Sequence, residues 1–289
     1  MAKFIPYFHV TKPRISLMVN FVAISSLIIA GGYGRFDTIV ILLISGFLSV
    51  AGASAFNAYF DRDLDSMMGR TRKRPIPSGT IMPAKKVLVM ASILSFASIM
   101  LSWTLINPLT AFFIGLGIFT YVGVYTLWLK RRHPSNIVLG GFAGSCAALA
   151  GWSSVANLTI VPLLIALVVF LWTPSHFWAL ALKIKDEYAK AKIPMLPSLV
   201  SAKRASITIL LNTLILVTSS VLLFFIGGQG FTYISIALLG GSLMIWANIK
   251  LVRDPSKRNA WTAYKISSPY LAIFFMALML DLILRPYLF

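Results

Sequence analysis

Residues 134–182 read PSNIVLGGFAGSCAALAGWSSVANLTIVPLLIALVVFLWTPSHFWALAL, which is 49 positions without a single Asp, Glu, Lys or Arg. A helix crosses a bilayer in about 20 apolar residues, so this run is long enough for two membrane-spanning helices. Its middle, Ala156–Pro162, contains polar residues and a proline that favour a turn. The stretch therefore predicts a pair of membrane helices joined by a short connection.

Five further uncharged runs extend the same pattern over the chain. They are Ile15–Gly34, Thr38–Phe60, Val87–Leu129, Ala205–Ile249 and Ile266–Leu284, the last interrupted only by Asp281. Two of these runs, of 43 and 45 residues, are again long enough for two helices, and Asn107-Pro108 and Gly227–Gly230 divide them. The sequence predicts an all-α polytopic membrane protein, a bundle of nine transmembrane helices in a single domain over residues 1–289.

The composition excludes several other classes of protein. Apolar residues make up 58% of the chain and charged residues 12%, and the formal net charge is +18. The basic residues lie in short clusters between apolar runs, so they form no continuous basic face and no nucleic acid partner is expected. The single Cys146 excludes an intramolecular disulfide. The lipid bilayer is the partner that this composition indicates.

The positions of the cations predict the orientation. If nine spans alternate, 24 of the 26 Lys and Arg residues fall on one side, and only Arg35 and Arg285 on the other. Positively charged loops remain in the cytoplasm. We therefore expect a multi-pass protein of the cytoplasmic membrane of the cell, with its N-terminus in the cytoplasm and its C-terminus outside.

The acidic residues indicate where function lies. Five of the eight fall in the two long cytoplasmic segments that follow the second and sixth predicted spans. Asn57, Asp61 and Asp65 are spaced by four residues, which places them on one face of a helix. Carboxylate and amide oxygens without imidazole or thiolate suit Mg²⁺. We predict these three as catalytic residues and metal ligands of an active site at the cytoplasmic side.

Cations follow these acids directly. Arg70, Arg72, Lys73 and Arg74 can hold a phosphate group by charge-assisted hydrogen bonds. Together with the acids they predict a diphosphate bridged by Mg²⁺. The alternative is a solvated helix end in which acids and bases form weak surface pairs. Asn57 favours the functional interpretation, because it lies inside an uncharged run where a polar group is costly.

The second long segment repeats this mixture of charges. Lys183, Lys185, Asp186 and Tyr188 are candidate substrate contacts, and Asp186 is also the candidate ligand of a second metal ion. These predictions require the two segments to fold over one cavity. A solvated loop is the alternative.

Four segments resemble the UbiA superfamily of intramembrane prenyltransferases and, within it, its heme-modifying branch, the protoheme IX farnesyltransferases. They are Thr11–Arg14, Asn57–Gly79 with its N-x-x-x-D-x-x-x-D and R-T-R-x-R-P-x-P-x-G patterns, Thr173–Ala181 and Asp186–Pro197. The aspartate pattern is typical of the whole superfamily, whereas the other three segments indicate the heme branch. The resemblance covers nearly the whole chain.

The resemblance implies an enzyme that transfers a farnesyl group from farnesyl diphosphate to a vinyl group of heme B. Addition of water gives heme O, and Mg²⁺ assists ionisation of the diphosphate. It also implies heme or substrate contacts at His176 and Trp178 in the sixth span, and an enzyme that uses heme O as a partner. His176 could instead bond a backbone carbonyl freed by Pro174.

The same residues are compatible with two other functions. The same chemistry could act on another acceptor, such as a quinone precursor or a lipid. A secondary transporter is the alternative from a different class, and it would carry charged residues near the middle of the bilayer.

Overall fold

The computed structural model describes residues 5–288, with side chains as far as Leu284, and all its regular elements are helices. Lys3 and the side chain of Arg285, which enter the charge count, lie outside this description. The α-helices are α1 (Ile5–Val10), α2 (Pro13–Ile29), α3 (Phe36–Phe60), α4 (Arg62–Met67), α5 (Lys85–Leu105), α6 (Pro108–Phe119), α7 (Asn136–Ser153), α8 (Ile160–Lys183), α9 (Lys185–Lys190), α10 (Leu196–Leu199), α11 (Ala202–Gly227), α12 (Phe231–Arg253) and α13 (Lys257–Leu288). A 3₁₀ turn covers Gly32–Gly34, and a π-helix, Thr120–Leu129, continues α6.

Within the described residues, seven helices are long and apolar enough to cross a membrane. They are α3, α5, α6 with its π-helix, α8, α11, α12 and α13. The all-α polytopic prediction is therefore confirmed. Helices α2 and α7 occupy the remaining two predicted spans, with 17 and 18 residues, but neither is among the seven. The count of nine spans stays a prediction.

The predicted breaks between paired helices are present. Asn107 is the N-cap of α6, where its side chain accepts a hydrogen bond from the N–H of Thr110 at 2.8 Å and Pro108 opens the helix. Gly228 ends α11 with φ of 61°, a left-handed conformation that favours glycine. The α5–α6 and α11–α12 pairs are thus separated by residues suited to a turn.

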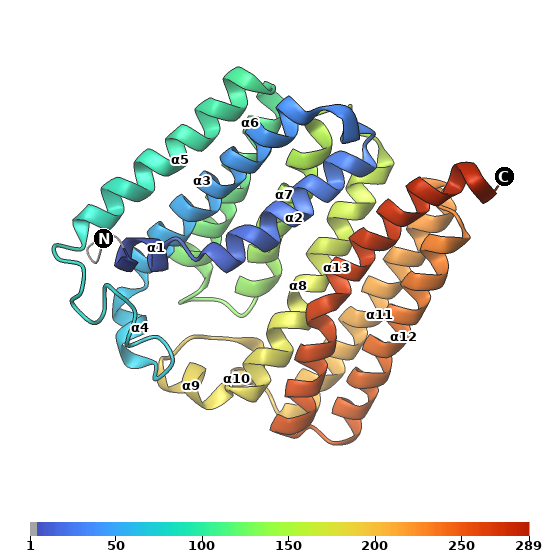
Figure 1. Ribbon diagram of the computed structural model, residues 1–289. Helices are drawn as coiled ribbons and strands as arrows, with labels where there is room; N and C mark the ends of the chain where they lie inside the picture. The colour runs from blue at the N-terminus through green and yellow to red at the C-terminus, as the bar shows by residue number, and fades with distance from the viewer. Residues whose placement is uncertain (1–4, 289) are drawn as a thin grey trace.

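Helix α8 occupies the centre of the packing. It contacts α7, α11 and α13, while α3 packs against α5, and α12 against α13. Figure 1 shows α3, α5 and α6 at one side of the bundle and α11 and α12 at the other, with α2 and α7 between them. The residues that converge on the candidate site come from the start of α2, the end of α3, α4 with the loop after it, and the π-helix with the residue that follows it.

Two glycines permit the helix crossings that fix this side of the bundle. A Cβ at Gly52 of α3 would lie 2.4 Å from Oγ of Ser95 on α5. A Cβ at Gly151 of α7 would lie 1.9 Å from the carbonyl oxygen of Ala23 on α2. Because the second contact is with backbone, which cannot move aside, only glycine permits that approach.

The two long polar segments meet, as the sequence analysis required. Helix α4 lies beside α9 and α10 in Figure 1, and Leu64 and Met68 of the first segment share a buried apolar cluster with Ala191, Ile193 and Met195 of the second. The contact is apolar, so it excludes water between the segments. It closes the end of the bundle at which α3 terminates.

Candidate active site

The row Asn57, Asp61 and Asp65 runs across the junction of α3 and α4. The N–H of Asp61 donates to the carbonyl of Asn57 at 2.9 Å, and the N–H of Asp65 to that of Asp61 at 2.8 Å, so helical bonding continues through the junction. All three side chains are buried, with exposed fractions of 4%, 1% and 4%. The alternative of a solvated helix end is therefore wrong for these residues. It holds for Asp63, which is mostly exposed and pairs with Arg131.

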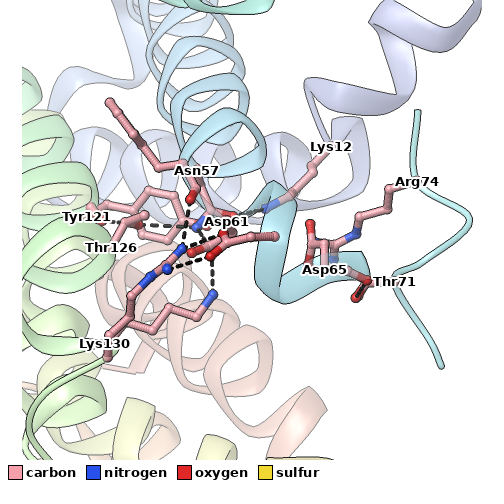
Figure 2. A network of polar contacts seen from close by, with 12 residues as sticks. Lys12, Asn57, Asp61, Asp65, Thr71, Arg74, Tyr121, Thr126 and Lys130 are labelled. Atoms are coloured by element: carbon pink, nitrogen blue, oxygen red, sulfur yellow. Dashed lines mark hydrogen bonds and ion pairs between the residues drawn. The ribbon is translucent and has the colours of Figure 1, made fainter. Parts of the chain in front are cut away.

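Asn57 connects three elements (Figure 2). Its Nδ2 donates to Oδ2 of Asp61 at 2.6 Å and to Oγ1 of Thr126 at 3.2 Å. Its Oδ1 accepts from Nζ of Lys12 at 2.8 Å, and the same ammonium reaches the hydroxyl of Tyr121 at 3.4 Å. The orientation of the amide is thus fixed from both ends, with its oxygen towards a cation.

Each carboxylate of the row has its own cation. Lys130 forms an ion pair with Oδ2 of Asp61. One guanidinium nitrogen of Arg74 donates to both oxygens of Asp65, at 2.9 and 2.8 Å, and Thr71 donates to the Asp65 carbonyl at 2.9 Å. With Lys12, three cations surround two carboxylates. This excess of positive charge suits an anionic ligand.

Oδ1 of Asp61 differs from the other oxygens of the row. It is fully buried and has no hydrogen-bond partner among the described residues. A buried carboxylate oxygen without a partner is costly, and a bound cation removes that cost. Oxygens of Asn57, Asp61 and Asp65 are hard donors of the kind that Mg²⁺ prefers. The residues present therefore fit this ion.

The π-helix places two further residues at the site. Tyr121 and Lys130 are nine positions apart, which is about two and a half turns of an α-helix and would put them on opposite faces. In the wider turns of a π-helix, nine residues make about two turns and share a face. The N–H of Lys130 donates to the carbonyl of Tyr125, and Oγ1 of Thr126 donates to that of Tyr121, both at 2.8 Å and both spanning five residues.

Lys12 is a half-buried cation at the start of α2. It precedes Pro13 as the N-cap and has φ of 51°, so the backbone turns there before the helix begins. Burial, with the nearby charges of Arg74 and Lys130, lowers the pKa of Lys12 from 10.5 to about 7. An anion beside the ammonium would stabilise its charged form.

Known proteins carry the same fold and sequence features. A sequence model of the UbiA prenyltransferase family matches residues 18–279. The chain belongs to the UbiA prenyltransferase family. With its seven apolar helices, this family member is a multi-pass membrane protein.

Similar sequences and structures cover almost all of this UbiA prenyltransferase. Protoheme IX farnesyltransferase 1 of Cenarchaeum symbiosum is 45% identical over 94% of both chains. Protoheme IX farnesyltransferase of Desulforudis audaxviator is 41% identical over 96% of this chain and 89% of the relative. A solved structure described as digeranylgeranylglyceryl phosphate synthase in membranes shares the fold, with a TM-score of 0.83, 18% identity and 97% and 99% of the two chains covered. A UbiA homolog from Archaeoglobus fulgidus bound to DMAPP and Mg²⁺ has a TM-score of 0.67, 18% identity and 94% and 98% coverage.

Other predicted residues of this UbiA prenyltransferase lie around the site without joining its hydrogen bonds. Arg70, Arg72 and Lys73 are exposed in the loop after α4 and form no side-chain ion pair among the described residues. Burial raises the pKa of Tyr188, while the charges of Arg70 and Lys130 act against that shift.

Asp186 does not join the other predicted metal ligands. Its carboxylate is more than half exposed and accepts from Nζ of Lys257 on α13 at 2.7 Å, a contact that lowers the pKa of Asp186. Among the described side chains, no group of three or more His, Cys, Asp or Glu residues is arranged to hold a metal ion. The arrangement thus assembles Asn57, Asp61 and Asp65 but leaves out Asp186, whose exposed carboxylate on α9 pairs with Lys257 of α13.

The lysines of the second segment are also placed differently from the prediction. Nζ of Lys183 lies 3.4 Å from the centre of the Trp261 ring on α13, a cation–π contact, and not beside the aspartates. Lys185 is half-buried at the start of α9. Neither forms a hydrogen bond to the row Asn57, Asp61 and Asp65 in the described residues.

The two residues predicted as heme contacts, His176 and Trp178, both lie on α8 but have different neighbours. Nδ1 of His176 lies 2.9 Å from Oγ of Ser267 on α13, so the alternative of a bond to a carbonyl freed by Pro174 is wrong. Trp178 is buried in an apolar cluster with Ile209 of α11 and other residues, which makes it a packing residue in this arrangement.

Sequence reasoning missed Lys12, Tyr121, Thr126 and Lys130 as members of the site. Lys12 stands in one of the segments that carry the family resemblance, which was its only signal. Lys130 lies in a cluster of three cations that topology alone explains. Tyr121 and Thr126 read as ordinary residues of a membrane helix, because a π-helix has no distinct pattern of apolar residues.

Proposed function

We propose that this chain transfers the farnesyl group of farnesyl diphosphate to a vinyl group of heme B and, with addition of water, forms heme O. The main structural support for this function is the buried row Asn57, Asp61 and Asp65. Three cations, Lys12, Arg74 and Lys130, surround it. The names of relatives that are 45% and 41% identical support farnesyl transfer to protoheme IX. Residues 1–289 act as a single catalytic domain in this proposal.

Mg²⁺ belongs to the proposed reaction. Asp61 through its unpaired Oδ1, with Asp65 and Asn57, would hold the ion. When bound, the ion supplies charge that stabilises the diphosphate as it leaves. A UbiA homolog with the same fold was solved with DMAPP and Mg²⁺, and another structure of that protein with GPP and Mg²⁺.

The side chains of this protein stabilise the leaving group directly. The C–O bond of the substrate breaks, its electron pair goes to the diphosphate oxygen, and an allylic cation remains. Lys12 and Lys130 are positioned to donate hydrogen bonds to that oxygen, since both ammonium groups already point towards the row. A vinyl carbon of heme B then attacks the cation, and water adds a hydroxyl group with release of a proton.

Water must otherwise be excluded, because it would hydrolyse the allylic cation. The apolar contact between α4 and α9–α10 covers the end of the bundle beside Asp65. Leu64, next to Asp65, is itself buried in that contact. We propose that these two segments close over farnesyl diphosphate, with the apolar tail between the membrane helices.

The environment of the reaction follows from the charge pattern. We propose the cytoplasmic membrane, with the site and the N-terminus facing the cytoplasm and the C-terminus outside. A heme O-using enzyme would take the product.

The transporter alternative is disfavoured by the buried acid Asp281, which accepts hydrogen bonds from the N–H groups of Gly230 and Tyr233 and so caps α12.

The purified protein with heme B, farnesyl diphosphate and Mg²⁺ tests the proposal. We expect a pigment heavier than heme B by one farnesyl unit plus water, identified by mass spectrometry. Asp61→Ala should abolish it, whereas Asp63→Ala, an exposed acid two residues away, should retain it. Prenylation of a quinone precursor or a lipid in place of heme, or full product from Asp61→Ala, would overturn the proposal.

A further inference from the structure

His176 is held between aromatic rings from two helices. Its imidazole stacks on Trp172 of α8, with ring centres 4.5 Å apart and planes at 18°, and on Tyr264 of α13, also at 4.5 Å and at 32°. The ring of Phe177 meets it edge-on at 5.3 Å. The Trp172 ring is stacked on the imidazole and the Tyr264 ring is tilted against it, so aromatic rings from two helices hold the histidine side chain. The two ring nitrogens make its polar contacts.

Ser267 determines which nitrogen carries the hydrogen. Its Oγ lies 2.9 Å from Nδ1 of His176 and donates to the carbonyl of Tyr264 at 2.8 Å. A hydroxyl has one hydrogen and a carbonyl can only accept, so the oxygen of Ser267 must accept from Nδ1–H. The carbonyl of Ser267 also accepts from Nε1 of Trp172 at 2.8 Å, which fixes the stacked ring.

Nε2 of His176 is then the nitrogen with the free lone pair. It forms no hydrogen bond within the described residues, and it is not sealed from solvent. By contrast, Nε1 of Trp178 on the same helix is sealed from solvent and has no hydrogen-bond partner. The 8% of His176 that stays accessible agrees with an open Nε2 edge.

We propose that Ser267 is a positioning residue that presents Nε2 of His176 to the iron of the heme substrate. The inference rests on the proposed function. It adds to that function a histidine that binds the heme iron and a serine that orients this histidine. Histidines that bind metals generally donate their other ring N–H to a neighbouring group, which fixes the tautomer and the ring plane. In this protein the partner of His176 is the hydroxyl of Ser267, which donates its own hydrogen to the carbonyl of Tyr264.

Binding of heme B alone, without farnesyl diphosphate, tests this assignment. Absorbance titrations should show that Ser267→Ala binds heme about 10–100-fold more weakly than the wild type, the usual effect of losing such a partner. Ser267→Thr keeps the hydroxyl and should bind nearly as the wild type does. Ser268→Ala is the matched control, because Ser268 donates to the same Tyr264 carbonyl at 2.9 Å without contacting His176.

A spectroscopic signature separates ligation from packing. The ferrous nitrosyl complex of the wild type should show in its EPR spectrum the additional splitting from an imidazole nitrogen, beyond that from the nitrosyl nitrogen; His176→Ala should lose this additional splitting and regain it with added imidazole. Nitrogen NMR of histidine-labelled wild type, assigned with His176→Ala, should show a hydrogen on Nδ1 before heme is added. This measurement does not depend on the folding of any Ser267 variant.

The outcomes distinguish two failures. If the wild type forms heme O but His176→Ala keeps the imidazole splitting in the EPR spectrum, or Ser267→Ala keeps wild-type heme affinity, the inference is wrong and the proposed function stands. A hydrogen on Nε2 would also overturn the inference. If the wild type forms no heme O, the proposed function fails, whatever the heme spectra show.

Discussion

Lys130 and Asp61 form an ion pair, and removing the lysine should destabilise the protein more than removing the aspartate. Asp61 is 1% exposed and Lys130 15%. Lys130→Met leaves a buried carboxylate with Nδ2 of Asn57 as its remaining partner, which should cost about 3–5 kcal/mol of unfolding free energy. Asp61→Ala leaves an ammonium on a flexible stem that can reach water, so its cost should be at or below about 3 kcal/mol.

Thermal unfolding in detergent measures this asymmetry. Lys130→Met should lower the midpoint by on the order of 10 °C, at about 2–4 °C per kcal/mol. The double variant should lose less than the sum of the single losses, because no unpaired charge remains. Mg²⁺ should partly restore Lys130→Met but not the double variant, since only the former keeps the carboxylate.

A matched control comes from the exposed pair of Arg131 and Asp63. Arg131→Ala should change stability by less than about 1 kcal/mol, because exposed ion pairs contribute little. The reasoning is refuted if Asp61→Ala is the more destabilising change, or if Lys130→Met unfolds at the wild-type temperature. Either result would mean that the carboxylate is not held in a dry environment by this lysine.

Three further changes probe the packing and the polar contacts. Gly151→Ala should cost about 1–3 kcal/mol or more of unfolding free energy, measured by thermal unfolding, because the new Cβ meets the carbonyl oxygen of Ala23 at 1.9 Å; wild-type stability would contradict that crossing. Thr126→Val removes a partner of Asn57 and should cost about 1 kcal/mol with slower diphosphate release, measured with labelled farnesyl diphosphate; an unchanged rate would separate this contact from the reaction. Asp281→Ala should cost about 1–3 kcal/mol by uncapping α12 and leave heme O formation intact in the same assay, so loss of product in a folded variant would refute a purely structural role.

Local patterns in the sequence predicted much of the candidate site. The four-residue spacing of Asn57, Asp61 and Asp65 is a property of one helix face, so it could be read without any tertiary information. The structure adds that this face is buried, which separates Asp61 and Asp65 from the exposed Asp63 between them. Exposure depends on neighbours from other helices and could not be derived from spacing.

The second segment shows the limit of local reasoning. Asp186 and Lys183 stand in a charged loop that resembles the first one, and the sequence gives no way to choose their partners. In the fold, both face α13, through Lys257 and Trp261 respectively. The partners are more than 70 residues away along the chain, so only the docking of α13 against this end of the bundle decides them.

By itself, the amino-acid sequence determined the class of the protein, the turns between paired helices and the row of oxygen ligands, because apolar runs, breaker residues and helical spacing act over short distances. Only the tertiary structure decided which cations meet that row and which nitrogen of His176 is free. Lys12, Lys130 and Ser267 reach their partners from separate helices, and such contacts depend on how the helices pack.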